Sequence, residues 1–313
     1  MDNAPTNPIN SEDILNRIKK RYKHLSKWAR GQQVDYFRVF DRDLPNAPFM
    51  IDSLPEHWVL WICTHYLSDS QESELIAAVK DGLALIAPKK IIVKSRKKDT
   101  VLKQDYFQTD EVTTVSEGGL RFELNLTRYL DTGLFIDHRK TRHFIKTHAK
   151  GKRVLNLFAY TGSFSCYALA GGANFVTSVD LNPTYSEWHK KNCDLNGFNP
   201  KQYELVTGCA INFLKKRYSS YDIIICDPPS FSHSKRKGVD TFQVQDDALD
   251  LVNHCFKNLK TNGWVLFSNN YRKFSVDKIA KHYNVTELTH KMCSKDFDGK
   301  WGSRCWGIYS PVI

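Results

Sequence analysis

The chain has 313 residues, 41% of them hydrophobic, and this length predicts two globular domains. Its net charge of +11 is typical of proteins that bind nucleic acid, with a generally basic soluble protein as the alternative. No apolar run approaches the roughly 20 residues of a membrane helix, and eight scattered cysteines without a C-x-x-C pair predict a reducing cytoplasm, no disulfide framework and no metal site.

The first 128 residues predict a small α+β domain. Ser11 is a suitable N-cap for a helix that runs to Arg30, and Gly31 is a suitable stop. Apolar runs and turn residues then predict short strands, a second helix and a hairpin around Gly118 and Gly119. The strands are expected at 34–40, 48–52, 57–66 and 89–98, the helix at 70–85 and the hairpin at 111–126.

Basic residues gather at two places in this domain. The helix at 11–30 carries lysines and arginines beside its apolar stripe, which fits an RNA-facing helix or an ordinary solvated face. Residues 89–103 hold seven Lys or Arg and one Asp, the densest positive patch in the chain. If this patch contacts RNA, neutralising Lys97 and Lys98 weakens RNA binding and reduces its salt dependence.

From Arg139 onward, strands and helices alternate, which predicts a parallel sheet. The final two strand-like runs, 284–293 and 303–311, have no strong helix between them and are expected to form an antiparallel pair at one edge. The remaining strands are expected at 154–158, 176–180, 203–207, 222–226 and 264–268, with helices near 162–170, 183–196, 210–218 and 241–260.

The segment from Val154 to Asp180 has the layout of a nucleotide-type cofactor site. An apolar strand enters a tight turn that contains Gly162, a helix follows, and a second strand ends at Asp180. A carboxylate at this position can accept hydrogen bonds from ribose hydroxyls. The G-x-G-x-x-G signature of a pyrophosphate site is absent, so a cofactor with a ribose and no phosphates fits better. The pattern therefore predicts S-adenosylmethionine.

A second motif follows the strand at 222–226. The loop reads Asp227-Pro228-Pro229-Ser230-Phe231, and its two prolines stiffen it and remove two backbone donors. The Asp227 carboxylate can then accept hydrogen bonds from a flat base on which Phe231 stacks. A plain turn is the alternative for Asp-Pro-Pro alone, but the position of the motif relative to the segment 154–180 favours a base methyltransferase. The predicted fold class is α/β: a class I methyltransferase Rossmann-like seven-stranded sheet at 129–313, with a smaller α+β domain at 1–128.

With these motifs, nearly the whole chain resembles the guanine-N7 methyltransferases of bacterial 23S ribosomal RNA. In many bacteria these form the C-terminal half of a bifunctional two-methyltransferase protein. The most specific matches are SVDLNPTYSEWHKKNCDLNGF (178–198) and DPPSFSHSKR (227–236), and LDTGLFIDHR (130–139) and LFSNN (266–270) also agree. The resemblance implies a cytoplasmic enzyme whose partner is 23S rRNA or a large-subunit assembly intermediate. Because the sequence begins directly at that half, it leaves open whether a separate protein replaces the other half.

The resemblance also implies a set of cofactor-binding residues. Asp180 would hold the ribose, and Leu181 would lie beside the adenine. One position departs from the pattern, because related enzymes carry an Asp after the third strand where this chain has Cys209. A backbone carbonyl or Asn212 would substitute for it, and weak cofactor affinity is the alternative. The implied set is Phe135, Asp137, Arg139, Asn156, Phe158, Tyr160, Gly162, Asp180, Leu181, Cys209 and Asp227.

For the guanine, the resemblance implies a catalytic set of Asp227, Pro228 and Phe231. Guanine N7 has an available lone pair, so positioning and electrostatics matter more than a general base. Asp227 would accept from the guanine N1–H or amino group and stabilise the positive charge that develops. The basic residues 235–237 would grip phosphates or form an ordinary solvated loop.

The same residues bear on three other functions. Cytosine C5 methylation needs a thiolate, but the fifth strand ends Phe267-Ser268-Asn269, and Cys226 is predicted to be buried. Methylation of an exocyclic amine of adenine or guanine is disfavoured modestly, because Ser230 separates the prolines from the aromatic residue. A non-catalytic RNA-binding or ribosome-assembly factor on the same fold is supported only by the missing carboxylate near Cys209.

Overall fold

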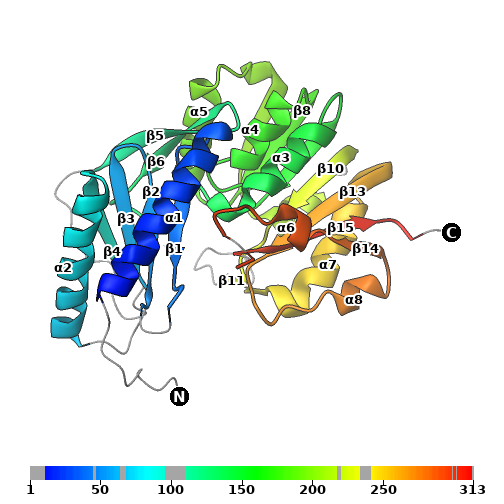
Figure 1. Cartoon of the computed structure of the whole chain (residues 1–313). Coiled ribbons are helices and arrows are strands. Elements are labelled where there is room, and N and C mark those ends of the chain that lie inside the picture. Colours follow the sequence, from blue (N-terminus) through cyan, green and yellow to red (C-terminus); the bar gives the residue numbers. More distant parts are fainter. Residues whose placement is uncertain are drawn as a thin grey trace. The chain divides into compact units, whose positions relative to one another are not determined.

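The computed structural model describes residues 11–44, 47–63, 68–95, 110–216, 220–232, 241–297, 299–300 and 302–311. The chain divides into two compact units, which Figure 1 shows in the colours of the sequence. Unit 1 comprises Met1–Ile136 with Lys295–Phe297, and unit 2 comprises Asp137–Ser294 with Asp298–Ile313. The predictions for Lys97, Lys98 and residues 235–237 lie outside the described residues. Among the described helices, none is long and apolar enough to cross a membrane.

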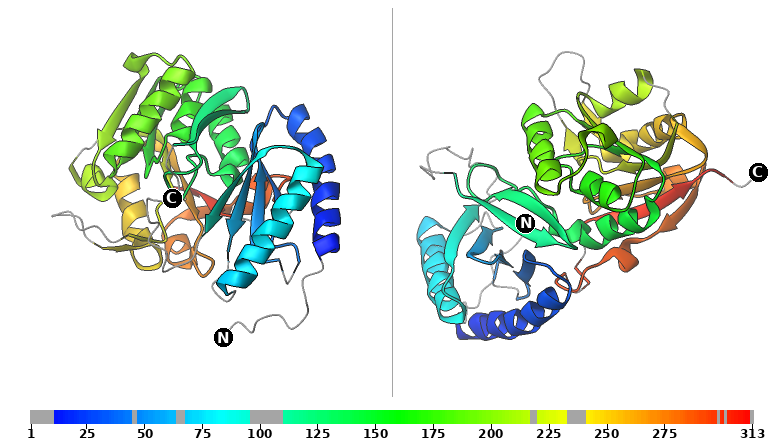
Figure 2. Two further views of the ribbon diagram at one scale, coloured as in Figure 1. Left: turned by 90° about the vertical axis from the view of Figure 1, so that its left-hand side faces the viewer. Right: turned by 90° about the horizontal axis from the view of Figure 1, so that it is seen from above.

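Unit 1 contains a four-stranded sheet in the order β1-β2-β3-β4, and a separate hairpin of β5 and β6. The first three strands are antiparallel, and β4 pairs in parallel with β3 after the crossover helix α2. Helices α1 and α2 pack side by side on this sheet, as Figure 2 shows. The elements are α1 (Ser11–Gly31), β1 (Phe37–Asp41), β2 (Phe49–Ser53), β3 (His57–Ile62), α2 (Asp69–Ile86), β4 (Lys90–Ser95), β5 (Val112–Glu117) and β6 (Leu120–Asn125).

The predicted apolar stripe of α1 forms part of the core of unit 1. Ile14, Ile18 and Leu25 are buried, and they recur at the three- and four-residue spacing of one helix face. Tyr22 makes an edge contact with the buried Trp58 of β3, with ring centroids 4.9 Å apart. The predicted helix and its buried face are confirmed.

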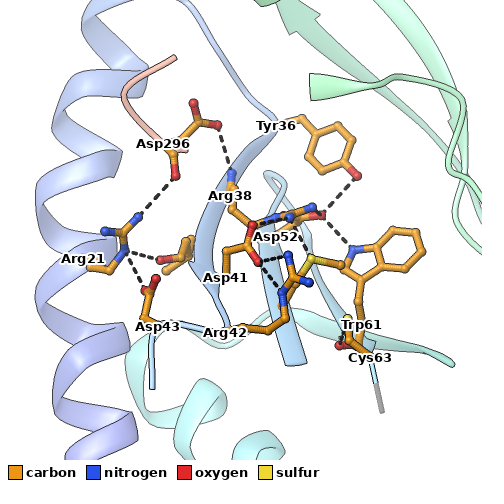
Figure 3. A network of polar contacts seen from close by, with 12 residues as sticks. Arg21, Tyr36, Arg38, Asp41, Arg42, Asp43, Asp52, Trp61, Cys63 and Asp296 are labelled. Carbon is orange, nitrogen blue, oxygen red and sulfur yellow. Dashed lines mark hydrogen bonds and ion pairs between the residues drawn. The ribbon is translucent and has the colours of Figure 1, made fainter. Parts of the chain in front are cut away.

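A buried polar network also holds unit 1 together (Figure 3). The Asp52 carboxylate is fully buried and accepts hydrogen bonds from Trp61 Nε1, at 2.8 Å, and from the Arg38 guanidinium. The Arg38 backbone N–H donates to the Asp296 carboxylate at 3.1 Å, and Arg21 donates to the Asp296 carbonyl at 3.2 Å. Because buried charges need such partners, the network fixes the segment Lys295–Phe297 in unit 1.

Unit 2 contains a seven-stranded sheet in the order β14-β15-β13-β10-β7-β8-β9. Only β15 runs antiparallel to its neighbours. The helices form two contacting groups, α3–α5 and α6–α8, on opposite faces of the sheet (Figures 1 and 2). This arrangement confirms the predicted fold class. The strands are β7 (Arg153–Leu157), β8 (Phe175–Asp180), β9 (Tyr203–Thr207), β10 (Tyr221–Cys226), β13 (Leu259–Asn269), β14 (Asn284–Glu287) and β15 (Arg304–Tyr309).

The helices of unit 2 connect these strands. They are α3 (Arg139–His148), α4 (Ser163–Ala170), α5 (Pro183–Leu195), α6 (Ala210–Lys216), α7 (Val244–Phe256), α8 (Asp277–Ala280) and α9 (Thr289–Met292), with the 3-10 turns η2 (Ile136–His138) and η3 (Pro200–Gln202).

In unit 2, three predicted elements differ most from the structure. The run 284–293 is not one strand, because β14 ends at Glu287 and the last residues form the short helix α9. The helix predicted at 241–260 is shorter, because Phe242–Gln243 forms strand β12 and pairs with β11 (Phe231–Ser232). The fifth strand begins earlier than predicted, because Leu259 already pairs with Tyr221.

The register of the parallel strands brings their carboxyl ends to one edge of the sheet. Leu157 pairs with Val179 on one side and with Cys226 on the other, and Cys226 also pairs with Phe267. The residues that follow these positions therefore lie together, at the edge where open α/β sheets bind ligands.

Candidate active site

The turn between β7 and α4 has an unusual backbone. Phe158, Tyr160 and Gly162 have φ values of 56°, 49° and 79°. Only glycine adopts this region without a steric penalty, so the turn stores strain at Phe158 and Tyr160. Gly162 is required for a second reason, because a Cβ at this position would lie 2.0 Å from Cδ2 of the buried His189.

Asp180 fixes the turn against the end of β8. Its Oδ2 accepts from the Tyr160 backbone N–H at 2.8 Å, and its Oδ1 accepts from the Asn182 N–H at 2.9 Å. Burial raises the pKa of this carboxyl, and the two backbone hydrogen bonds oppose the rise. Each carboxylate oxygen retains a lone pair, which suits hydroxyl donors. Asn182 also caps α5, where Pro183 occupies the first turn.

Asn156 lies beneath the turn in a buried hydrogen-bond network. Its Nδ2 donates to Ser165 Oγ at 2.9 Å, and Ser165 shares a hydrogen bond of 2.8 Å with Ser178. The Asn156 side chain is only 1% exposed. The network ties β7, α4 and β8 together, so Asn156 supports the turn from below.

The loop after β9 lies against the same edge. The Gly208 N–H donates to the Asp180 carbonyl at 2.8 Å, and a Cβ on Gly208 would meet nothing within 4 Å. Cys209 follows and is half-buried, as is Leu181 after β8. The structure therefore brings Cys209 close to Asp180 and leaves open space beside it.

Asp227 is held by side chains from other segments. Ser268 Oγ at the end of β13 donates to Asp227 Oδ1 at 2.6 Å, and His138 Nε2 lies 3.5 Å from Oδ2. Asn269 Nδ2 donates to the Pro228 carbonyl at 3.1 Å. The Asp227 side chain is 26% exposed, so it remains accessible to a substrate. His138, Ser268 and Asn269 are residues of this site that the sequence did not predict. For Ser268, the signal was its place at the end of the neighbouring strand.

Two exposed aromatic rings flank this loop. The Phe231 side chain is 57% exposed, and Tyr271 is 38% exposed. Their loops are joined by a hydrogen bond of 2.7 Å from Ser230 Oγ to Asn270 Oδ1. Such rings provide a surface on which a base can stack.

Two residues around η2 form hydrogen bonds within unit 2. Asp137 Oδ2 accepts from Ser303 Oγ at 2.8 Å, and Arg139, which is buried, donates to Ser294 Oγ at 2.8 Å. Phe135 belongs to unit 1 and is 41% exposed. The structure therefore places Asp137 and Arg139 on either side of His138, the residue that contacts Asp227.

Comparison with known proteins agrees with this geometry. Residues 80–266 match a family profile described as S-adenosylmethionine-dependent methyltransferase. Ribosomal RNA large subunit methyltransferase K of Neisseria meningitidis serogroup B is 38% identical over 307 residues, which cover 94% of this chain and 86% of that protein. The chain belongs to this methyltransferase family.

Longer relatives contain a comparable region. Ribosomal RNA large subunit methyltransferase K/L of Shewanella baltica (strain OS155) is 41% identical over 298 residues, which cover 91% of this methyltransferase and 41% of that protein. This chain therefore spans less than half the length of the K/L relatives.

Solved structures share the fold. SMU.776, described as a methyltransferase and complexed with SAH, gives a TM-score of 0.78 at 21% identity, covering 97% of this chain and 83% of that one. Trm5b from Pyrococcus abyssi gives a TM-score of 0.56 at 15% identity, covering 83% of this chain and 74% of that one.

The donor set fits the cofactor of this methyltransferase family, S-adenosylmethionine. The Asp180 carboxylate suits a ribose, and the open space at Gly208 suits a flat ring beside it. The buried Cys226 does not supply a nucleophile, because burial and the neighbouring Cys255 raise the pKa of its thiol. The predicted burial of Cys226 is confirmed, and thiolate chemistry on a pyrimidine ring has no support at this loop.

Proposed function

We propose that the protein methylates N7 of a guanosine in 23S rRNA. The observation that carries the proposal is the Asp227 carboxylate, which is accessible and held at the same sheet edge as Asp180. The name of the Neisseria relative supports ribosomal RNA as the substrate class.

The cofactor is proposed to lie across the carboxyl ends of β7, β8 and β9. Asp180 accepts hydrogen bonds from the ribose hydroxyls, and the adenine lies between Leu181 and the loop at Cys209. Phe158, Tyr160 and Gly162 shape the turn beneath it. Asp137 and Arg139 are proposed to lie toward the methionine end.

The guanine is proposed to lie at the end of β10. When bound, S-adenosylmethionine supplies a methyl group on a positively charged sulfur. Asp227 accepts from the N1–H or amino group of the base, and Ser268 holds the carboxylate in its orientation. Phe231 stacks on the base, which is worth about 1–3 kcal/mol. No residue has to remove a proton, because the N7 lone pair attacks the methyl carbon directly.

Charge moves during this transfer from the sulfur to the purine. The bond between N7 and the methyl carbon forms as the carbon–sulfur bond breaks, and its electron pair stays on sulfur. The base gains the positive charge near Asp227. A fixed carboxylate at this place stabilises the transition state more than the ground state.

Unit 1 is proposed to present the RNA, and its clearest feature for this role is the outer face of α1. The face is basic and exposed, which suits phosphates. The target nucleotide must leave its helix to enter the pocket, as base-modifying enzymes require. The exposed basic residues of α1 are Arg17, Lys19, Lys20, Lys23, His24, Lys27 and Arg30.

The test is methylation of unmodified 23S rRNA with labelled S-adenosylmethionine, followed by digestion to nucleosides. We expect label in 7-methylguanosine. Asp227→Asn should lose turnover while its affinity for SAH is retained. Asp222→Asn is the matched control, because Asp222 lies at the opposite end of β10 and pairs with Lys260 on the surface.

Each other outcome has a definite meaning. Label in N2-methylguanosine or N6-methyladenosine would overturn the assignment to N7. No label, with RNA and SAH both bound, would favour a non-catalytic assembly factor. Equal activity of Asp227→Asn and wild type would remove Asp227 from the chemistry.

A further inference from the structure

A buried cluster of two thiols and one imidazole lies beside the glycine turn. Cys166 comes from α4, and His189 and Cys193 come from α5. All three side chains are buried, and their potential ligand atoms lie within 4.8 Å of one another. His189 and Cys193 are four residues apart, so they share one helix face.

One nitrogen of the His189 ring lacks a partner. The Nε2 of His189 is buried and has no hydrogen-bond partner among the described residues. The Cys193 thiol interacts with both Cys166 and His189. A buried polar atom without a partner is rare in proteins, and a bound ion is one of its recognised explanations.

We propose that Cys166, His189 and Cys193 bind one Zn²⁺ ion. Zinc–sulfur and zinc–nitrogen bonds of about 2.3 and 2.0 Å place three ligand atoms roughly 3.5–4 Å apart. The cluster is close to that size, so small side-chain rotations suffice. Two thiolates, a neutral imidazole and a divalent ion give no net charge, which suits a buried site. Three protein ligands leave one position for a water molecule.

The chain offers a second buried cysteine pair as an internal comparison. Cys226 and Cys255 are both fully buried, and their thiols interact with each other. Among the described residues, no third ligand completes this pair. The imidazole therefore distinguishes the proposed site. The sequence predicted no metal because its cysteines are scattered, and only the packing of α4 on α5 brings these ligands together.

The site adjoins the cofactor turn through His189. The ring lies where a Cβ of Gly162 would be. A metal ion would fix the ring and thereby support the turn, so the ion is expected to have a structural role. Binding of the metal does not depend on the proposed guanine chemistry.

The test uses the full chain, purified reduced and without chelators. We expect about one zinc per chain by mass spectrometry. After exchange with Co²⁺, we expect a sulfur-to-cobalt charge-transfer absorption. Cys193→Ser should lose both signals, and Cys255→Ser should keep them.

Two results would contradict the zinc site. Absence of the charge-transfer band in the wild type, or an undiminished band in Cys193→Ser, would overturn the proposal. If Cys193→Ser does not fold, His189→Gln provides the same test with both thiols intact. Its band should weaken and shift, and an unchanged spectrum would again exclude the site.

Discussion

Replacing Gly162 by alanine tests the physical account of the cofactor turn. The φ of +79° costs a residue with a Cβ roughly 1–2 kcal/mol. The new Cβ would also lie 2.0 Å from Cδ2 and 2.3 Å from Nε2 of His189, whose ring is buried. Overpacking of this kind costs about 1–3 kcal/mol. We therefore expect Gly162→Ala to lower the free energy of unfolding of unit 2 by roughly 2–5 kcal/mol.

Gly197→Ala is the matched control in the same unit. Its φ is +66°, and a Cβ there would meet nothing within 4 Å. Gly197→Ala should lower the free energy of unfolding only by the backbone contribution of roughly 1–2 kcal/mol. The difference between the two variants then measures the contact with His189.

The assay is urea unfolding, combined with hydrogen exchange of the α4 and β8 amides to isolate unit 2. Adding His189→Ala to Gly162→Ala should recover part of the excess loss, because the ring that blocks the Cβ is gone. Equal losses for Gly162→Ala and Gly197→Ala would refute the steric argument. So would a double variant that shows no coupling between the two positions.

Three further predictions concern the cofactor, the base and the RNA. Burial raises the Asp180 pKa above its ordinary 3.8, so the folded protein holds this proton to a higher pH than the unfolded chain does. Ionisation of Asp180 therefore lowers the stability of the fold as the pH rises from the unfolded pKa through the folded pKa. The proposed binding to ribose uses the ionised carboxylate, so the SAH affinity measured by calorimetry should decline on acidification at a higher pH than an ordinary Asp would give. Asp180→Asn should bind SAH weakly and without this pH dependence. Identical pH profiles of the wild type and Asp180→Asn would contradict the assignment. Ser268→Ala removes a hydrogen bond to the Asp227 carboxylate and should lower kcat roughly 10- to 100-fold at unchanged SAH affinity; a change in SAH affinity alone would place Ser268 at the cofactor instead. Neutralising three exposed lysines of α1 should reduce the slope of log K against log salt for rRNA binding by about 2, and an unchanged slope would show that α1 does not touch the RNA. These lysines are Lys20, Lys23 and Lys27.

The sheet of unit 2 was predictable because its strands are apolar runs that end in informative residues. Ile223, Ile224 and Ile225 are buried as a continuous run predicts. Asp180 ends one parallel strand and Asp227 follows another, and the carboxyl ends of such strands meet at one edge. The two carboxylates could therefore be placed together without a structure.

Contacts between segments that are distant in the sequence could not be predicted from the patterns of strands and helices. His138 approaches Asp227 only because η2 folds back to the sheet edge, and no periodic pattern in the sequence predicts this position of η2. Asp296 lies in a loop of the second half of the chain, yet it accepts hydrogen bonds from Arg38 and Arg21 and belongs to unit 1. The Phe242 strand replaced a predicted helix start because its partner, β11, comes from the loop after Asp227.

The two carboxylates differ in a way that separates cofactor binding from base selection. Asp180 is fixed by backbone N–H groups of Tyr160 and Asn182, which every substitution at those positions except proline retains. Asp227 is fixed by the side chains of Ser268 and His138, which substitution can remove. The proposed cofactor-binding carboxylate therefore tolerates change in its neighbours, whereas the orientation of the proposed base-binding carboxylate depends on two side chains. Variation among related enzymes with different target bases is expected at positions 138 and 268 rather than around Asp180.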